Sequence, residues 1–333
     1  MEARARAEAA LRGEQAAPAG AVEWAGLVPP APTAALTPSA ARSLHQRRRL
    51  SRAGGWHTCA LRKDGKVFCW GGNEHGQVGV AAAGSVLRPV EVPIGQPIRK
   101  LALGGPFSCA ITDDNRAMCW GDDENGELGD GTAGGARSVP AFVKMADGSE
   151  LNSVVDLAVG SCSSCALTSN GSVGVYCWGC NNWSQIGRTT TEAVQSAVPL
   201  LVPSSASTRQ LTLSAEAAAF FGSDMICGWG SNIGSAISGA AMTTFAMPTC
   251  FSLASVLQPF LGEGFGCARL ASGAVQCWGL QIGSSTIVGP PGTGVPGIVA
   301  TALGGGNGSR LRARRERKRE VLGREFLWGA RGR

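Results

Sequence analysis

The stretch that decides the fold is GGWHTCALRKDGKVFCWGGNEHGQVG at residues 54–79, which returns as GGPFSCAITDDNRAMCWGDDENGELG at residues 104–129. In both copies two apolar segments flank a short polar turn, and the second segment ends on Cys-Trp-Gly. Lys63-Asp64-Gly65 makes a three-residue loop in which Gly65 can take a positive φ without steric penalty. Each copy is therefore predicted to form a β-hairpin.

Three further copies follow, at residues 160–187, 214–237 and 262–283. The tryptophans that align them are separated by 50, 58, 51 and 49 residues, and they are Trp70, Trp120, Trp178, Trp229 and Trp278. A period near fifty is typical of propellers and other repeat arrays, whose units bury their apolar faces against one another. Strands expected at 98–105, 154–160 and 298–305 bring each unit to about four strands, the size of a propeller blade. We predict an all-β propeller of about five recognisable units, with residues 298–309 resembling a sixth that stops.

The shared pattern of Gly, His-Thr, Cys-Ala-Leu, Asp-Gly, Cys-Trp-Gly and Gly-Gln-Val-Gly resembles the regulator of chromosome condensation repeat, over roughly residues 51–305. The superfamily of that repeat also includes the β-lactamase-inhibitory propeller. The resemblance is close in the first two copies and weak in the fourth, which keeps Cys227, Trp229 and Gly230. It implies a propeller that usually has seven blades, so five readable units predict a smaller ring, an incomplete one, or one completed by degenerate blades.

Cysteines recur at fixed places in these hairpins. The register sets four pairs opposite one another across the strands: Cys59 and Cys69, Cys109 and Cys119, Cys165 and Cys177, and Cys267 and Cys277. Cys162, Cys165, Cys177 and Cys180 also spell C-x2-C-x11-C-x2-C, a spacing found in zinc sites. Residues three apart on a regular strand point to opposite faces, so four thiolates would converge only on bulged strands. Cross-strand thiols or disulfides are the preferred interpretation, zinc is the alternative, and no cofactor is expected.

The five repeat tryptophans are predicted to pack between blades, because a large ring at one fixed place in every unit dominates the buried area. Trp56 and Trp183 lie outside that position and are candidates for surface contacts. Two less favoured alternatives are photoreception by clustered tryptophans, as in a plant ultraviolet-B receptor related to this family, and calcium binding by residues 122–131.

Catalytic motifs are absent from the sequence. Its three histidines are His45, His57 and His75, and it has no phosphate-binding loop, nucleophile elbow or zinc-protease motif. We therefore predict that the protein is not an enzyme. Asn170, Asn182 and Asn307 begin Asn-x-Ser sequons, which matter only if the chain is exported.

Charge and composition divide the chain into three predicted parts. Residues 1–50 form a low-complexity tail rich in Ala, Pro and Arg, residues 51–309 form the propeller, and residues 310–333 form a basic tail with a short helix; both tails are expected to be flexible. The basic tail has ten Arg or Lys against three Glu, whereas residues 51–309 have thirteen basic against seventeen acidic residues. Nucleic acid is therefore expected to bind through the tail if at all.

The N-terminus has no apolar segment of signal-peptide length, and no window approaches the roughly 20 apolar residues that span a bilayer. The chain is predicted to be soluble and cytoplasmic or nuclear, without a membrane partner. Twelve cysteines would suit an oxidising compartment, which makes an extracellular location the alternative if the N-terminus is incomplete.

Three functions remain open from the sequence. The first is a non-catalytic scaffold that binds a protein of unknown identity. The second, implied by the resemblance, is a guanine-nucleotide exchange factor for a Ran-type small GTPase that associates with chromatin. The third, also implied by it, is an extracellular inhibitor-like propeller.

Overall fold

The structure is a computed structural model, and it describes residues 48–193, 195–204, 208–222, 224–232, 237, 243–280, 287–300, 302–304 and 312–314. His45, the low-complexity tail up to residue 47 and most of the expected C-terminal helix lie outside the described residues. Within the range of that helix, Arg312–Arg314 form a β-strand instead, because they pair with Ala302–Gly304. None of the described residues forms a helix of the length and hydrophobicity that crossing a membrane requires.

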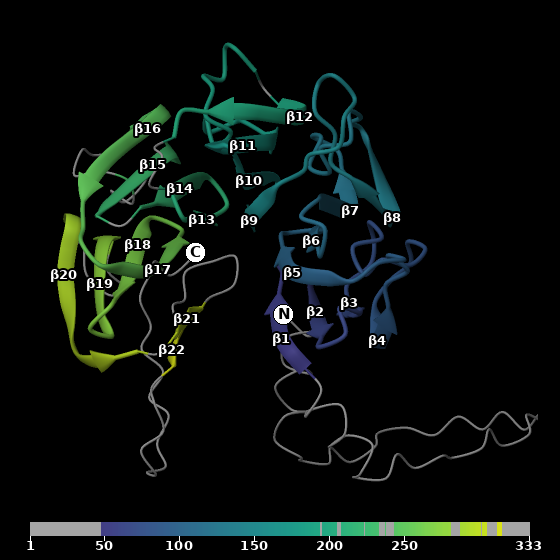
Figure 1. Ribbon diagram of the computed structural model, residues 1–333, viewed down its shortest axis with the longest axis horizontal. Coiled ribbons are helices and arrows are strands. Elements are labelled where there is room, and N and C mark those ends of the chain that lie inside the picture. Colours follow the sequence, from purple (N-terminus) through teal and green to yellow (C-terminus); the bar gives the residue numbers. More distant parts are fainter. Residues whose placement is uncertain are drawn as a thin grey trace, which may run out of the picture. The chain divides into compact units, whose positions relative to one another are not determined.

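Five four-stranded antiparallel sheets follow one another along the chain (Figure 1). The first contains β1 (Arg48–Ala53), β2 (His57–Arg62), β3 (Val67–Gly71) and β4 (Val86–Glu91); the second contains β5 (Ile98–Leu103), β6 (Phe107–Thr112), β7 (Ala117–Asp123) and β8 (Gly135–Phe142). The third contains β9 (Val154–Val159), β10 (Ser163–Asn170), β11 (Ser172–Cys180) and β12 (Gln195–Val202); the fourth contains β13 (Gln210–Leu213), β14 (Ala217–Phe221), β15 (Met225–Ser231) and β16 (Thr244–Ser252). The fifth contains β17 (Val256–Gly262), β18 (Phe265–Leu270), β19 (Ala274–Leu280) and β20 (Ile287–Val299), and β21 (Ala302–Gly304) pairs with β22 (Arg312–Arg314).

Each sheet is a meander in which strands pair in chain order, so every repeat forms one propeller blade. The hairpin turns use the conformations expected from their residues: φ is +83° at Gly65, +65° at Asn115 and +81° at Gly273. The strand expected over residues 298–305 differs from the prediction, because residues 298 and 299 still belong to β20 and the next strand begins at Ala302. Among the described strands, none pairs the first sheet with the last.

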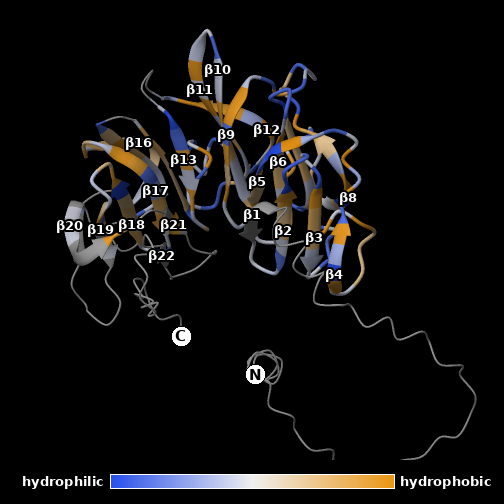
Figure 2. Cartoon of the chain, turned by 60° about the horizontal axis from the view of Figure 1, so that its bottom comes forward, coloured by the Kyte–Doolittle hydropathy of each residue, from blue (hydrophilic) through white to orange (hydrophobic). Residues whose placement is uncertain are grey.

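Hydrophobic residues concentrate along the strands (Figure 2), and the buried core lies between neighbouring sheets. Trp120 clusters with Leu61 and Val78 of the first sheet. Equivalent tryptophans in the next three sheets also pack against the sheet that precedes them: Trp178 against Leu128, Trp229 against Ile186, and Trp278 against Leu253. Each of these four blades contributes a fully buried indole to the blade before it, whereas Trp70 of the first blade is only partly buried. The four later blades therefore share their core with a neighbour.

The first strands of successive sheets are joined by polar side chains. Asp156 of β9 pairs with Lys100 of β5 through one carboxylate oxygen, and its Oδ2 accepts a hydrogen bond from the Leu211 amide of β13 at 2.8 Å. Gln258 of β17 bonds both backbone groups of Leu303 in β21, at 2.7 and 2.8 Å. These side chains connect sheets that share no backbone ladder, and they fix neighbouring blades relative to one another.

The fourth strand lies at the outer edge of each sheet, and all five of these strands contain proline: Pro89 in β4, Pro140 in β8, Pro199 in β12, Pro248 in β16, and Pro290, Pro291 and Pro296 in β20. Proline cannot donate a backbone hydrogen bond, so it prevents an edge strand from pairing with another chain. The edges are therefore poor binding surfaces, and the loops at the two ends of the sheets are left for recognition.

Candidate functional site

The repeat cysteines lie at register positions within the sheets. Cys59 is opposite Cys69, Cys109 is opposite Cys119, Cys165 is opposite Cys177 and Cys267 is opposite Cys277. Each pair forms a disulfide, and so do Cys162 with Cys180 and Cys227 with Cys250. The described residues include no free cysteine.

Sequence reasoning missed the partner of Cys227. In the fourth copy Ala219 and Gly228 stand opposite one another where the other copies have their two cysteines, and Cys227 lies one residue earlier, opposite Phe220. Cys227 therefore bonds to Cys250, which is opposite it on β16. Counting the cysteines could have predicted this pair. Ten of the twelve fit the repeat pattern or its C-x2-C extension, which leaves Cys227 and Cys250 to bond to each other.

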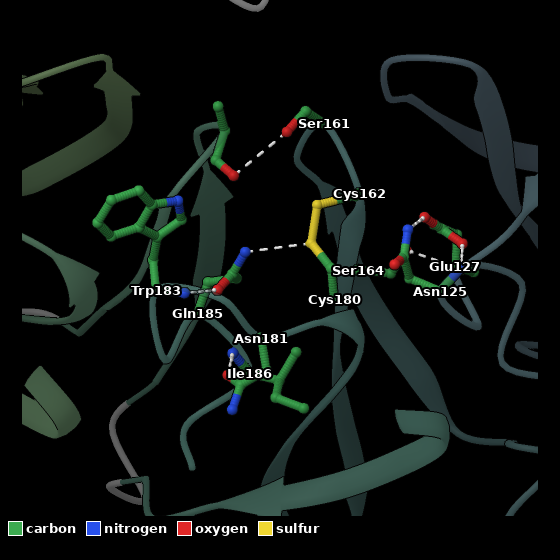
Figure 3. The surroundings of a disulfide bond; sticks show 11 residues. Asn125, Glu127, Ser161, Cys162, Ser164, Cys180, Asn181, Trp183, Gln185 and Ile186 are labelled. Atoms are coloured by element: carbon green, nitrogen blue, oxygen red, sulfur yellow. Dashed lines mark hydrogen bonds between the residues drawn. A yellow bond between two sulfur atoms is a disulfide. The ribbon is translucent and has the colours of Figure 1, made fainter. Parts of the chain in front are cut away.

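The four cysteines with zinc-like spacing are divided between two disulfides. Cys165–Cys177 is fully buried in the third sheet, and Cys162–Cys180 lies at the end of the same hairpin (Figure 3). Gln185 Nε2 donates a hydrogen bond to the Cys180 sulfur at 3.1 Å. A disulfide sulfur is not the thiolate that zinc requires, and no group of three or more His, Cys, Asp or Glu within the described part of the chain is arranged for a metal.

The repeat tryptophans make a second contact besides packing. Trp120 Nε1 donates to the backbone carbonyl of Gln77 at 3.0 Å, Trp178 Nε1 to that of Glu127 at 2.9 Å, and Trp229 Nε1 to that of Gln185 at 2.9 Å. The three acceptors are equivalent residues in the loop that follows the third strand of the preceding sheet. Each buried indole N–H thus has its partner in the neighbouring blade.

His57 has a structural environment. It is 3% exposed, and its Nε2 lies 2.6 Å from the Ser108 hydroxyl of the next sheet, which itself donates to the Gln77 carbonyl. Burial lowers the pKa of His57 to about 4, because the charged ring would lose its hydration. His75 lies nearer the surface, where its Nδ1 is 3.1 Å from Asp122 Oδ1 of the next sheet.

Asp123 ends β7 at a position where three other sheets have asparagine. Its Oδ1 accepts the Leu128 amide at 3.0 Å, as Asn73 Oδ1 accepts the Val78 amide. Burial raises the pKa of Asp123 to about 6, and the nearby Asp130 carboxylate adds to the effect. The pKa of Glu127 is also raised by burial. These carboxyls bind loop backbone and side-chain groups of their own blade, and they converge on no bound group.

A small cavity of about 10 Å³, with room for about one water molecule, lies between the fourth and fifth sheets. Its lining consists of apolar side chains and one glycine, and includes Phe221, Ile226 and Trp278. It contains no group that could transfer a proton or attack a substrate.

The antiparallel meander puts two kinds of loop at the two ends of the sheets. Loops that join the first strand to the second, and the third to the fourth, lie at one end, and these loops touch between blades: Gly55 N donates to Gly104 O at 2.9 Å, and Ser161 Oγ donates to Ala215 O at 3.3 Å. We define this end as the acidic face, comprising residues 54–56, 72–85, 104–106, 122–134, 160–162, 181–193, 214–216 and 263–264. The loops at the other end form the opposite face.

Charge separates the two faces. The acidic face has nine carboxyl groups against Arg188, and they are Glu74, Asp122, Asp123, Glu124, Glu127, Asp130, Glu192, Glu216 and Glu263. The opposite face has five basic residues against six acidic ones, namely Lys63, Lys66, Arg116, Lys144 and Arg209 against Asp64, Asp113, Asp114, Asp147, Glu150 and Asp224. The sequence analysis found the body of the chain mildly acidic, and the topology collects that excess at one end.

Within the described residues, the two tryptophans outside the repeat position lie on the acidic face. Trp56 is 65% exposed and Trp183 is 41% exposed. A Cβ placed on Gly72 would lie 3.2 Å from Trp56 Cβ and 3.0 Å from Glu74 Oε2, so the indole and the carboxylate flank the same glycine.

Comparison with known proteins agrees with this architecture. The model of the regulator of chromosome condensation repeat matches residues 52–77, 98–127 and 154–184, and a second model of the same repeat matches residues 174–215. No curated protein matches the chain.

Solved structures with the same fold include human WBSCR16, with 21% identity and a TM-score of 0.59 over 69% of this chain and 61% of that chain. Yeast RCC1 (Prp20), in a complex with Kap60, has 18% identity and a TM-score of 0.66 over 79% of this chain and 66% of that chain. Prp20p of Saccharomyces cerevisiae, a protein studied for its binding to Gsp1p and histones, has 17% identity and a TM-score of 0.64 over 79% of this chain and 68% of that chain. The chain thus spans about two thirds of the length of these structures or somewhat less. At this identity the likeness establishes the fold alone. The chain carries repeats of the regulator of chromosome condensation family and folds as a β-propeller.

Proposed function

We propose that the protein is a non-catalytic scaffold that holds another protein against its acidic face. The observation that carries the proposal is the exposure of Trp56 and Trp183 on that face. Tryptophan is the residue type most often found at the centre of protein interfaces, where its large rigid ring buries much apolar area at little entropic cost. Loops on a rigid repeat framework present such anchors in fixed positions.

The remaining surfaces favour this proposal over catalysis or strand addition. Proline in the outer strands blocks pairing at the sheet edges, as argued above. The buried titratable groups with shifted pKa values include His57, Asp123 and Glu127, and they serve contacts within and between blades. We therefore assign no enzymatic role to the chain.

The disulfides bear on where the scaffold works. Six disulfides within one propeller persist in an oxidising compartment, whereas thiols stay reduced in the cytosol and nucleus. This favours the extracellular, inhibitor-like alternative over a cytoplasmic or nuclear location. The mass of the intact protein from its native source, measured with and without thiol alkylation, tests it. We expect no added alkyl groups before reduction, and twelve alkylated cysteines in the native protein would exclude an extracellular role.

The scaffold is tested by affinity capture from the native source followed by mass spectrometry. We expect a protein that is retained by the wild type and by Leu87→Ala, which removes an 88% exposed side chain from an outer strand. The double variant Trp56→Ala/Trp183→Ala should lose it. If the double variant retains the same protein, the acidic face is not the binding surface.

The exchange-factor alternative rests on the resemblance of the repeats, because the fold shared with Prp20p carries no information on activity at 17% identity. A nucleotide-release assay on a purified Ran-type small GTPase separates the two proposals. We expect no acceleration of release, and a catalytic acceleration would replace the scaffold by an exchange factor.

A further inference from the structure

The strongest further inference concerns what binds at the first blade of the acidic face. It rests on the scaffold function proposed above and deepens it by naming the class of partner. We propose that the acidic face binds an extended, arginine-rich segment of the partner protein, with Trp56, Glu74 and Gln77 forming the position where one arginine is anchored.

Charge complementarity is the first argument. Of the nine carboxyl groups on this face, Asp130 is paired with Arg137 of β8 at 2.7 Å, and Asp123 and Glu127 are buried. The Arg188 guanidinium is bonded to the carbonyls of Gly187 and Leu201. Glu74, Glu124, Glu192 and Glu263 are exposed, so their charges act on an approaching partner. A surface of one sign attracts the opposite sign and repels its own, which selects basic partners and accelerates their association.

The second argument is independent of charge and concerns an unused hydrogen-bond donor. Gln77 is fully buried, and its Nε2 has no hydrogen-bond partner among the described residues. Its Oε1 accepts the His75 amide at 2.9 Å, just as Gln185 Oε1 accepts the Trp183 amide at 2.8 Å in the third blade. In the third blade the side-chain nitrogen of Gln185, Nε2, donates a hydrogen bond to the Cys180 sulfur (Figure 3).

Gly72 occupies the position of Cys180 in the first blade, so the partner that the equivalent Gln185 Nε2 has in the third blade is missing for Gln77 Nε2. From this equivalence we infer that Gln77 Nε2 points toward Gly72. Gly72 lies beside Trp56 and the Glu74 carboxylate. A buried donor left without an acceptor costs free energy, which a carbonyl of a bound peptide would recover.

Together these groups match an arginine in an extended peptide. The guanidinium can stack on the exposed Trp56 indole and pair with Glu74, and the peptide carbonyl can accept from Gln77 after a small opening of the loop. Lysine satisfies the charge but neither stacks as well nor bonds two oxygens at once, so arginine is preferred.

The test is a titration by fluorescence anisotropy with the full chain. The probe is a fluorescein-labelled 12-residue peptide of alternating Arg and Ser, and the matched peptides have Lys or Glu in place of Arg. We expect binding in the order Arg, then Lys, with none for Glu, and a loss of at least tenfold in affinity between 50 and 500 mM NaCl. Trp56→Ala and Glu74→Gln should each weaken the arginine peptide about fivefold. The controls are Leu87→Ala and Asp113→Asn, which change an exposed outer strand and the opposite face; both should bind like the wild type.

Any one of these peptide results overturns the inference: no binding of the arginine peptide, equal binding of the lysine peptide, unchanged binding by Trp56→Ala and Glu74→Gln, or equal loss in the two controls. An unlabelled peptide of residues 310–333 is added as competitor in a separate arm. If it binds more than tenfold tighter than the arginine probe, the occupant is the basic tail of this chain and no partner segment. If capture still yields a protein that depends on Trp56 and Trp183 but ignores salt and the arginine peptide, the scaffold stands and this inference fails.

Discussion

The Nε1 of Trp178 donates a hydrogen bond to the Glu127 carbonyl of the preceding sheet at 2.9 Å. The same carbonyl lies 3.4 Å from the Ser164 hydroxyl, so two groups of the third blade meet one backbone atom of the second. Because equivalent bonds join Trp120 to Gln77 and Trp229 to Gln185, the indole is both the packing element and the polar link between blades.

Replacing Trp178 by Phe removes the N–H donor and part of the buried ring. The expected loss is about 2–3 kcal/mol in the free energy of unfolding, from one hydrogen bond and a small cavity. Urea unfolding followed by circular dichroism measures it. Trp183→Phe, at an exposed site, should cost less than about 0.5 kcal/mol. Equal losses in the two variants would contradict the role given to the repeat indole.

Asp123→Asn should stabilise the protein near neutral pH. The folded protein holds the pKa of Asp123 at about 6, above the 3.8 of an unperturbed aspartate, so the folded state binds the proton more tightly. The wild type therefore loses stability as the pH rises from about 4 to about 6, and Asn removes this loss. We expect a gain of about 1 kcal/mol at pH 7.5 and none below pH 4.

Asn73 and Asn181 already show that an amide fits this position, because each accepts the loop amide and donates to carbonyls of its loop. Thermal melts of Asp123→Asn and of the exposed control Asp113→Asn across pH 4 to 8 provide the measurement. A lower melting temperature of Asp123→Asn at pH 7.5 would show that the carboxylate is needed in its ionised form.

His57→Gln should change the response to acid. The folded pKa of about 4 lies below the unfolded value of 6.5, so between these values the unfolded chain binds a proton that the folded chain excludes. Stability therefore falls as the pH is lowered from 6.5 to 4, with a slope of up to about 1.4 kcal/mol per pH unit from this group. Gln keeps a donor for the Ser108 hydroxyl and does not titrate. Chemical denaturation at pH 5 and 7 should show a smaller difference for the variant, and an unchanged difference would exclude His57 as the source.

Asp156→Asn tests the polar links between the first strands. The change removes the charge that pairs with Lys100 while keeping an oxygen for the Leu211 amide. Since Asp156 is 7% exposed, Lys100 is left facing a partly buried site without its counter-charge, and a loss of about 2 kcal/mol is expected. The double variant Lys100→Met/Asp156→Asn should recover part of it in the same unfolding assay. No recovery would mean that the ion pair contributes little.

Much of the fold could be predicted from local sequence. The three-residue turn at Lys63-Asp64-Gly65 fixes a hairpin, and the register of that hairpin sets Cys59 opposite Cys69. Repetition of the pattern then predicts a blade and its stacking. The partner of Cys250 could not be predicted in this way. A long loop joins β15 to β16, and a loop of that length does not determine which residues of the two strands lie opposite one another.

The sequence by itself determined the hairpins, their period and the all-β class, because turn chemistry and strand alternation act between residues close together in the chain. Only the tertiary structure decided which loops share one end of the sheets, and therefore that Trp56, Trp183 and nine carboxyl groups belong to one face. The blades are held together by packing of the indoles and by hydrogen bonds such as that from the Leu211 amide to Asp156. Such contacts join residues some fifty positions apart, so no pattern of neighbouring residues in the sequence predicts them.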